Sequence, residues 1–394
     1  MPIFKKKEEP TGWKNTLNKA LYSVRFFSQT PLNQPRNYKN DLIQGYLDNE
    51  LIYSIVNKLS GKASSVPIIL KDENDDIINK HWSLDFLEQP NPDMTFKELI
   101  NAYYIYLLSL GNSYMYSPVL TSERRNELWI MPAEEIEIVM GQWYEPIKGY
   151  KLITGQQEIE FDRNEVLHSK LFNPRFAGGQ WVYGLSPISV ALEIIKGYNL
   201  GVERMQNSFI NGGPEYAIFT KEGLLNGEQL KQMEETFNRK FTGSKNAKKM
   251  AFSSQPLDAV KLGSDPVDLS IIDNNIQCLR TLCNVYNVSS ILFNDSANST
   301  LDNYKQARLD MYNDAIIPLN TDLAQRLTKF LKLKNEGLHF EFDYSDVEVL
   351  QESLETRYKG LNDVNYLTSN EKREKIGYNP LEKEIQKDGK EQDN

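Results

Sequence analysis

The fold is decided by residues 186–210, which read SPISVALEIIKGYNLGVERMQNSFI. Ser186 can cap a helix that begins at Pro187, because a serine hydroxyl accepts first-turn N–H groups and proline suits the first helical position. The apolar residues recur at alternating short steps, which predicts a long helix with one narrow apolar seam that ends before Asn211-Gly212-Gly213-Pro214. The seam residues are Ile188, Leu192, Ile195, Tyr198, Val202, Met205 and Phe209.

A second narrow seam occupies residues 270–287. Its members are Ile272, Ile276, Leu279, Cys283 and Tyr286. Between the two seams, residues 212–268 predict a strand at 216–219, a helix at 227–241, a basic turn, and strands at 250–252 and 257–262. Two amphipathic helices that bracket a small α/β insert predict a stalk that carries a tip.

The residues before the first of these helices have the pattern of a mixed α+β module. Residues 1–40 are polar and predict an arm. Helical spacing of Leu47, Leu51, Ile55 and Leu59 predicts a helix over 41–60, followed by a strand at 66–70. An apolar helix over 95–110 should stop at Gly111-Asn112. From 113 to 170 the period changes to two, which predicts several short strands of an antiparallel sheet.

The C-terminal part begins with the polar stretch 293–300. A long helix is predicted over 301–334, kinked at Pro318 because proline removes one helical hydrogen bond. Residues 338–344 alternate as a strand. The charged tail from about residue 383 is predicted to be disordered.

Composition excludes several classes of protein. The chain has 394 residues, which predicts two or more modules, and its net charge of -9 argues against tight binding of a polyanion. Cys278 and Cys283 are poorly spaced for a bridge, and the histidines His81, His168 and His339 are too scattered for an evident metal site. No apolar run is long enough for a membrane span, and no secretory signal is recognised.

No motif for catalysis or for a cofactor is found, so we expect neither. Glu134, Glu135 and Glu137 are interpreted as the solvated face of a strand rather than as a metal or acid–base cluster. His168 is interpreted as structural, and the run 103–106 as packing rather than a stacking platform for bases. Lys245, Lys248 and Lys249 form a basic patch, for which a contact with DNA or a partner and a plain solvated turn are equally good interpretations.

The order of the segments resembles that of tailed-bacteriophage portal proteins, of the shorter type found with long-tailed phages. Each motif is weak alone, but their order and spacing over residues 40–380 are specific. They are LEQPNP at 87–92 with Phe96, LGNSY at 110–114, WIMP at 129–132, EVLH at 165–168, YGLSPI at 183–188, NGGP at 211–214, YNV at 286–288, and LTSNEKR at 367–373 with Gly377-Tyr378. One departure is Ser289, where the family often has a proline after the valine.

The resemblance implies an α+β portal fold with a wing, a helical stem, a small clip, a tunnel loop and a short crown. In this chain it divides the residues into an arm (1–40), wing (41–186), stem helix (187–211), clip (212–268), second stem helix (269–292), tunnel loop (293–300), wing (301–345), and crown with tail (346–394). The stem seams are then expected to contact neighbouring subunits. The expected interface residues are Ile188, Leu192, Ile195, Val202, Ile272, Ile276 and Leu279.

The resemblance also implies partners. The chain should form a homo-oligomeric ring, a dodecamer, at the portal vertex of a virion that is assembled in the bacterial cytoplasm. The ring should dock the terminase large subunit and then the head–tail adaptor, contact the major capsid protein, and pass double-stranded DNA without gripping it. It implies no membrane, no cofactor and no enzymatic activity.

The tunnel loop is the segment expected to face the DNA. Its polar residues are Asn294, Asp295, Ser296, Asn298, Ser299 and Thr300. Asp295 is its only charge, so a ring is expected to carry a collar of carboxylates that repels phosphates. An ordinary surface turn is the alternative, because Asn, Asp and Ser favour turns in any protein.

Two other functions stay open from the sequence. A different virion protein, such as an adaptor or a capsid component, would explain the missing chemistry but not the order of helix, insert and helix. A nucleic-acid-processing enzyme would need a convergent cluster of carboxylates or histidines, which the sequence does not offer.

Overall fold

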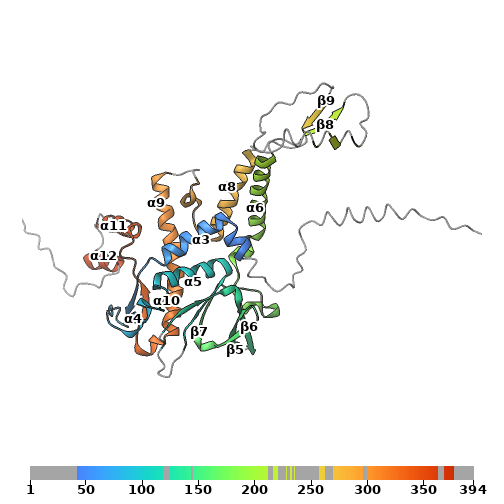
Figure 1. Cartoon of the computed structure of the whole chain (residues 1–394). Coiled ribbons are helices and arrows are strands. Elements are labelled where there is room, and N and C mark those ends of the chain that lie inside the picture. Colours follow the sequence, from blue (N-terminus) through green and yellow to red (C-terminus); the bar gives the residue numbers. More distant parts are fainter. Residues whose placement is uncertain are drawn as a thin grey trace, which may run out of the picture. The chain divides into compact units, whose positions relative to one another are not determined.

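A computed structural model describes residues 42–118, 125, 127–142, 145–211, 216–220, 228, 231–232, 235, 257–261, 269–295, 300–362 and 368–376. All of these belong to one unit, Lys39–Asn394. Figure 1 shows the helices α3 (Glu50–Ala63), α5 (Phe96–Leu110), α6 (Pro187–Asn211), α8 (Leu269–Val285), α9 (Leu301–Asp310) and α10 (Ile317–Phe330). The structure also describes helices α4 (Trp82–Glu88), α11 (Glu348–Asn362) and α12 (Ser369–Ile376).

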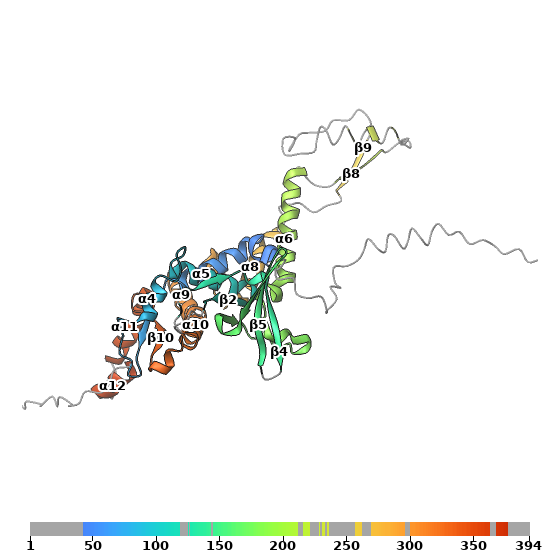
Figure 2. The same cartoon turned by 60° about the horizontal axis from the view of Figure 1, so that its bottom comes forward.

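The strands pair in antiparallel fashion. β2 (Asn112–Tyr116) lies between β3 (Trp129–Met131) and β7 (Val166–Lys170), and β5 (Glu145–Thr154) lies between β4 (Ile136–Gln142) and β6 (Gln157–Asp162). Figure 2 shows β4 and β5 side by side. The antiparallel pairing predicted for 113–170 is therefore confirmed, but it is divided between two sheets of three strands.

Two further strand pairs join distant parts of the chain. β1 (Ile68–Lys71) pairs with β10 (His339–Phe342), so the predicted strands at 66–70 and 338–344 become partners. β8 (Tyr216–Thr220) pairs with β9 (Leu257–Lys261) inside the insert between α6 and α8. The predicted strand at 250–252 and most of the predicted helix at 227–241 lie outside the described residues.

Helix α5 begins and ends as its sequence predicts. Thr95 and Glu98 form a capping box, in which each side chain accepts the other's backbone N–H. The helix ends at Gly111, which has a left-handed φ of 73° and whose Cα faces the Leu185 carbonyl so closely that a Cβ would clash. Glycine is required there for both reasons.

The helix predicted over 41–60 is instead two helical pieces. A π-helical turn, Leu42–Leu47, is followed by α3, and Asn49 starts α3 afresh because its side chain accepts the Ile52 N–H at 3.0 Å. The core face of α3 is consequently Ile52, Ile55, Val56 and Leu59. Leu47 is exposed and not part of the predicted seam.

The predicted long helix is helical from Leu301 to Phe330, shorter than expected at its C-terminal end. A π-helical turn, Met311–Ile316, interrupts it immediately before Pro318. Proline has no backbone N–H and cannot donate a helical hydrogen bond to the turn before it. The wider π-helical turn tolerates this missing bond, and Pro318 lies in the first turn of α10. The interruption is therefore where the sequence predicts the kink.

The core gathers α3, α5, α6, α8 and α10 around large side chains. Tyr103, Tyr104 and Tyr114 are among the largest fully buried residues. The interpretation of residues 103–106 as packing is confirmed for Tyr103 and Tyr104. In the part of the chain that the structure describes, no helix is both long and apolar enough to cross a membrane.

Candidate functional site

The candidate site is the helix pair α6–α8 together with the segment Ser289–Asp295 that follows α8. Ser186 caps α6 as predicted, since its hydroxyl oxygen accepts the Ser189 N–H at 3.1 Å. The same hydroxyl donates to the Ser109 carbonyl at 2.8 Å, which ties the start of α6 to the end of α5. α6 and α8 run side by side (Figure 1).

The apolar seams of this pair face the core of the same chain. Ile188 and Ile195 are buried within the chain, and so are Leu282 and Cys283 on α8. Ile188 and Ile195 therefore offer no surface to a neighbour, and their prediction as interface residues is wrong. A narrow seam on a helix is equally what a helix needs to pack against its own core.

The other predicted interface residues are placed differently. Leu192, Val202, Ile276 and Leu279 are half-buried, and the side chain of Ile272 lies outside the described residues. By contrast, Val190 and Leu200 on α6 are 61% and 60% exposed. Val190 and Leu200 are not part of the apolar seam of α6, so the helical periodicity of apolar residues does not identify them.

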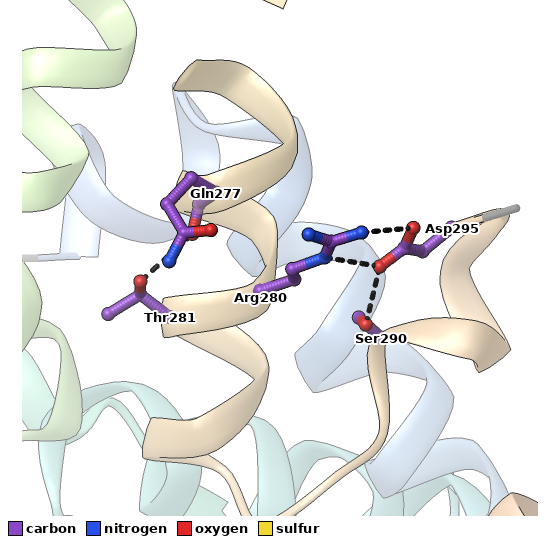
Figure 3. A network of polar contacts seen from close by, with 5 residues as sticks. All are labelled: Gln277, Arg280, Thr281, Ser290 and Asp295. Atoms are coloured by element: carbon purple, nitrogen blue, oxygen red, sulfur yellow. Dashed lines mark hydrogen bonds and ion pairs between the residues drawn. The ribbon is translucent and has the colours of Figure 1, made fainter. Parts of the chain in front are cut away.

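An ion pair joins the end of α8 to the segment after it (Figure 3). Arg280 donates through Nε and Nη2 to the two carboxylate oxygens of Asp295, at 2.7 and 3.0 Å. The Ser290 hydroxyl donates to the same carboxylate at 2.8 Å. On the neighbouring side of α8, Thr281 Oγ1 donates to the Gln277 carbonyl at 2.9 Å. The carboxylate raises the pKa of Arg280, which stays charged.

Asp295 is thus not the exposed, unpaired charge that the carboxylate collar requires. Its side chain is only 4% exposed, and its charge is offset by Arg280. The collar prediction is corrected on this point, because a buried and neutralised carboxylate repels phosphates weakly. The polar stretch does end in a cap, since Thr300 accepts the Asn303 N–H at 3.2 Å and begins α9. Asn294 has a left-handed φ of 64°, and Ser296, Asn298 and Ser299 lie outside the described residues.

Lys58 of α3 holds the same segment from a second direction. Its ammonium donates to the Leu292 carbonyl and lies 4.7 Å from the centre of the Phe293 ring. Burial lowers the pKa of Lys58. Lys58, Arg280 and Ser290 belong to the candidate site but were not predicted from the sequence. No local signal points to them, because each depends on a contact made by the folded chain.

The remaining candidates have structural roles or lie elsewhere. His168 Nε2 is 3.2 Å from Asn112 Oδ1, the ring stacks on Tyr114, and burial lowers the pKa of His168 to about 3, which confirms the structural interpretation. Cys278 and Cys283 are free thiols. Lys245, Lys248 and Lys249 lie outside the described residues.

The three glutamates do not form a cluster for metal binding. Glu137 is exposed on β4 as predicted, whereas Glu134 and Glu135 lie in a short 3-10 turn before the strand and are half-buried. Among the residues whose positions are described, no group of three His, Cys, Asp or Glu side chains is placed to hold a metal ion.

Comparisons with known proteins agree with this architecture. The sequence model of the phage portal protein family matches residues 50–377. An uncharacterised protein of Rickettsia bellii (strain RML369-C) is 28% identical over 349 residues, which are 85% of this chain and 88% of that protein. One of Rickettsia felis (strain ATCC VR-1525 / URRWXCal2) is 26% identical over 385 residues, 94% of this chain and 96% of that protein.

Solved structures share the fold. A chain in the neck of an empty gene transfer agent particle, computed with C6 symmetry, has a TM-score of 0.67 and 23% identity over 88% of this chain and 95% of that one. A chain in the native neck, computed with C12 symmetry, has a TM-score of 0.64 and 22% identity over the same shares. A HK97 family phage portal protein from Corynebacterium diphtheriae has a TM-score of 0.58 and 13% identity over 77% and 94%.

Proposed function

Because this chain belongs to the phage portal protein family, we propose that identical copies of it close into a ring at one vertex of a virus head, and that DNA passes through this ring. The observation that carries the proposal is the family match over residues 50–377, which spans α6, the insert, α8 and the segment after α8. The C12 symmetry of the neck that contains a chain of similar fold supports a dodecamer.

The charge of the chain suits a conduit. Each phosphate gripped by Lys or Arg releases counterions and adds affinity, which would slow the movement of DNA. The net charge of -9 is repeated in every copy, so the ring as a whole repels the duplex. With Asp295 paired to Arg280, the neutral residues Asn294, Ser296, Asn298, Ser299 and Thr300 are proposed to face the DNA.

The insert between α6 and α8, residues 212–268, is proposed to dock the terminase large subunit and then the head–tail adaptor. Its position in the chain between two stem helices supports an exposed end. The ring would also contact the major capsid protein and would act as a structural component of the virion, not as an enzyme. Reversing Lys245, Lys248 and Lys249 to glutamate should keep the ring and weaken terminase attachment.

Native mass spectrometry of the purified chain tests the ring. We expect closed rings of about a dozen copies, visible also by negative-stain imaging. A chain that stays monomeric at all concentrations would overturn the proposal. Duplex DNA should bind the ring weakly, and the affinity should fall only modestly with added salt, whereas tight, steeply salt-dependent binding would contradict the conduit.

A further inference from the structure

A strongly exposed pair of aromatic rings lies between β7 and α6. The segment Leu171–Tyr183, named here the aromatic loop, presents Phe172 at 84% and Phe176 at 61% exposure. The Phe176 ring stacks on Trp181, with 5.6 Å between centroids and 13° between planes. Exposed apolar side chains that gather in one place mark interaction sites.

Polar contacts within the chain hold the backbone of the aromatic loop. Lys170 Nζ donates to the carbonyls of Trp181 and Val182, at 2.6 and 3.1 Å. Asn173 Nδ2 donates to the carbonyls of Gln180 and Tyr183, at 3.0 and 3.2 Å. Rings carried on a backbone that is already ordered lose little conformational freedom when a partner covers them, so this loop is preorganised for docking.

The charge around the loop selects the kind of partner. The chain has 54 acidic and 45 basic residues, yet no Asp or Glu occurs between Glu165 and Glu193. Lys170 and Arg175 lie inside that stretch, and Arg175 is exposed between the two phenylalanines. The complement of such a surface is an apolar face with carboxylates at its rim. A DNA duplex fits less well, since its stacked bases lie inside and its outer surface is dominated by phosphates.

The chain itself carries a face of that complementary kind. The start of α3 and the middle of α6 are joined by Asn49 Nδ2, which donates to Asn199 Oδ1 at 2.9 Å, and by the Tyr198 hydroxyl, which donates to Glu50. Flanking these contacts are exposed apolar and acidic residues, together named here the α3–α6 face. They are Leu47, Asp48, Glu50, Tyr53, Leu200 and Glu203.

We propose that the aromatic loop of one copy docks on the α3–α6 face of the next copy. The two surfaces differ, so the contact is head-to-tail, and a head-to-tail contact repeated with a closing rotation makes a ring. The inference rests on the proposed function, because it supplies the contact from which that ring is built. It replaces the seam residues Ile188 and Ile195, which are buried inside the chain.

The test uses two variants of the full chain, each with one defective surface. Phe172→Asp damages the loop, and Leu200→Asp damages the face; both side chains are mostly exposed, so the fold should be kept. Ile77→Asp alters an exposed apolar residue outside both surfaces and is the matched control. Thermal unfolding of each monomer checks that folding is intact, and native mass spectrometry reports assembly.

We expect the unaltered chain and Ile77→Asp to form rings, and each surface variant alone to stay monomeric. An equimolar mixture of the two variants should form dimers and nothing larger, because the intact loop of one chain meets the intact face of the other only once. Rings formed by either variant alone, or a mixture without dimers, would overturn the inference. If Phe172→Asp keeps the ring but loses DNA binding, the loop binds nucleic acid and the inference is wrong.

A charge exchange adds a second readout. Arg175→Glu should abolish the ring. Asp48→Arg or Glu203→Arg introduced into the same chain should restore it, because an acidic loop then meets a basic residue on the α3–α6 face. Failure of both double variants to form rings would contradict the pairing. Absence of rings in the unaltered chain would instead contradict the proposed function, so the two failures are distinguishable.

Discussion

Arg280 and Asp295 are joined by two parallel hydrogen bonds of 2.7 and 3.0 Å, and this pair fastens the segment after α8 to the last turns of that helix. The carboxylate also accepts the Ser290 hydroxyl, so three donors converge on one buried group (Figure 3). A two-point contact between a guanidinium and a carboxylate fixes orientation as well as distance. Asp295 therefore positions the start of the predicted tunnel loop.

Replacing Asp295 with alanine should lower the free energy of unfolding by about 1–3 kcal/mol, because the Ser290 hydroxyl loses its acceptor in a poorly solvated place. Asp295→Lys should be at least as damaging, since it places an ammonium group in a poorly solvated position beside Arg280, and added salt should restore the stability only in part. Chemical denaturation measures both. Asp346→Ala, at an exposed aspartate, is the control and should be nearly neutral. A salt-reversible packaging defect in a stable Asp295→Lys ring would instead support the exposed collar.

The same substitution should destabilise the monomer at one position on α6 and have almost no effect at another. Ile195 is buried against the core, so Ile195→Asp should destabilise the monomer by at least about 3 kcal/mol, through lost packing and a desolvated carboxyl group. Val190 is 61% exposed on the same helix, so Val190→Asp should leave monomer stability within about 0.5 kcal/mol. Equal melting temperatures for the two variants would show that the burial of α6 is wrongly assigned.

His168 should make stability depend on pH in the mildly acidic range. Burial lowers its pKa from 6.5 to about 3, so the unfolded chain binds a proton between these values and the folded chain does not. Stability from this group is complete above about pH 6.5 and is lost as the pH falls toward 3, at up to about 1.4 kcal/mol per pH unit. Thermal unfolding from pH 7 to 5 measures the slope, and His168→Gln should flatten it. Parallel curves for the two proteins would contradict the prediction.

Elements set by local residues were predictable from the sequence. Ser186 and Pro187 begin α6, Gly111 ends α5, and Pro318 lies beside the interruption before α10, each because of its own backbone chemistry. The start of α3 was not predicted. The spacing of Leu47, Leu51 and Ile55 continues past Asn49 and indicates one unbroken helix, whereas the Asn49 side chain caps a new one. Periodicity reports that a helix has an apolar face but not whether that face meets its own core or another chain.

The candidate site was predictable only as a region. Asn294 and Thr300 lie where turn and cap chemistry place them. The partner of Asp295 was not predictable, because Arg280 is fifteen residues away on a helix and nothing in its neighbourhood distinguishes it from any solvated arginine. The same holds for Lys58, which reaches the segment from α3. Contacts between side chains distant in sequence come from packing, which spacing does not encode.

A buried hydrogen bond between α5 and α10 supports the last prediction. The Tyr104 hydroxyl donates to Asn320 Oδ1 at 2.6 Å, and both residues are fully buried. Asn320 Nδ2 in turn donates to the Ala63 carbonyl at 3.3 Å, so one side chain links α10 to both α5 and the end of α3.

Tyr104→Phe keeps the ring in place but leaves the Asn320 oxygen without its donor, which should lower the free energy of unfolding by about 1–3 kcal/mol. Tyr46→Phe removes a longer hydroxyl contact, 3.3 Å to the Asn57 side chain, in a partly solvated place and should cost less, about 0.5–1 kcal/mol. Urea denaturation of both variants gives the comparison. Leucine has nearly the shape of asparagine but no amide oxygen. Asn320→Leu added to Tyr104→Phe therefore removes the unpaired acceptor and should recover part of the lost free energy of unfolding. A Tyr104→Phe cost no larger than that of Tyr46→Phe would mean that Asn320 is satisfied by other groups and that the link between the helices is apolar packing alone.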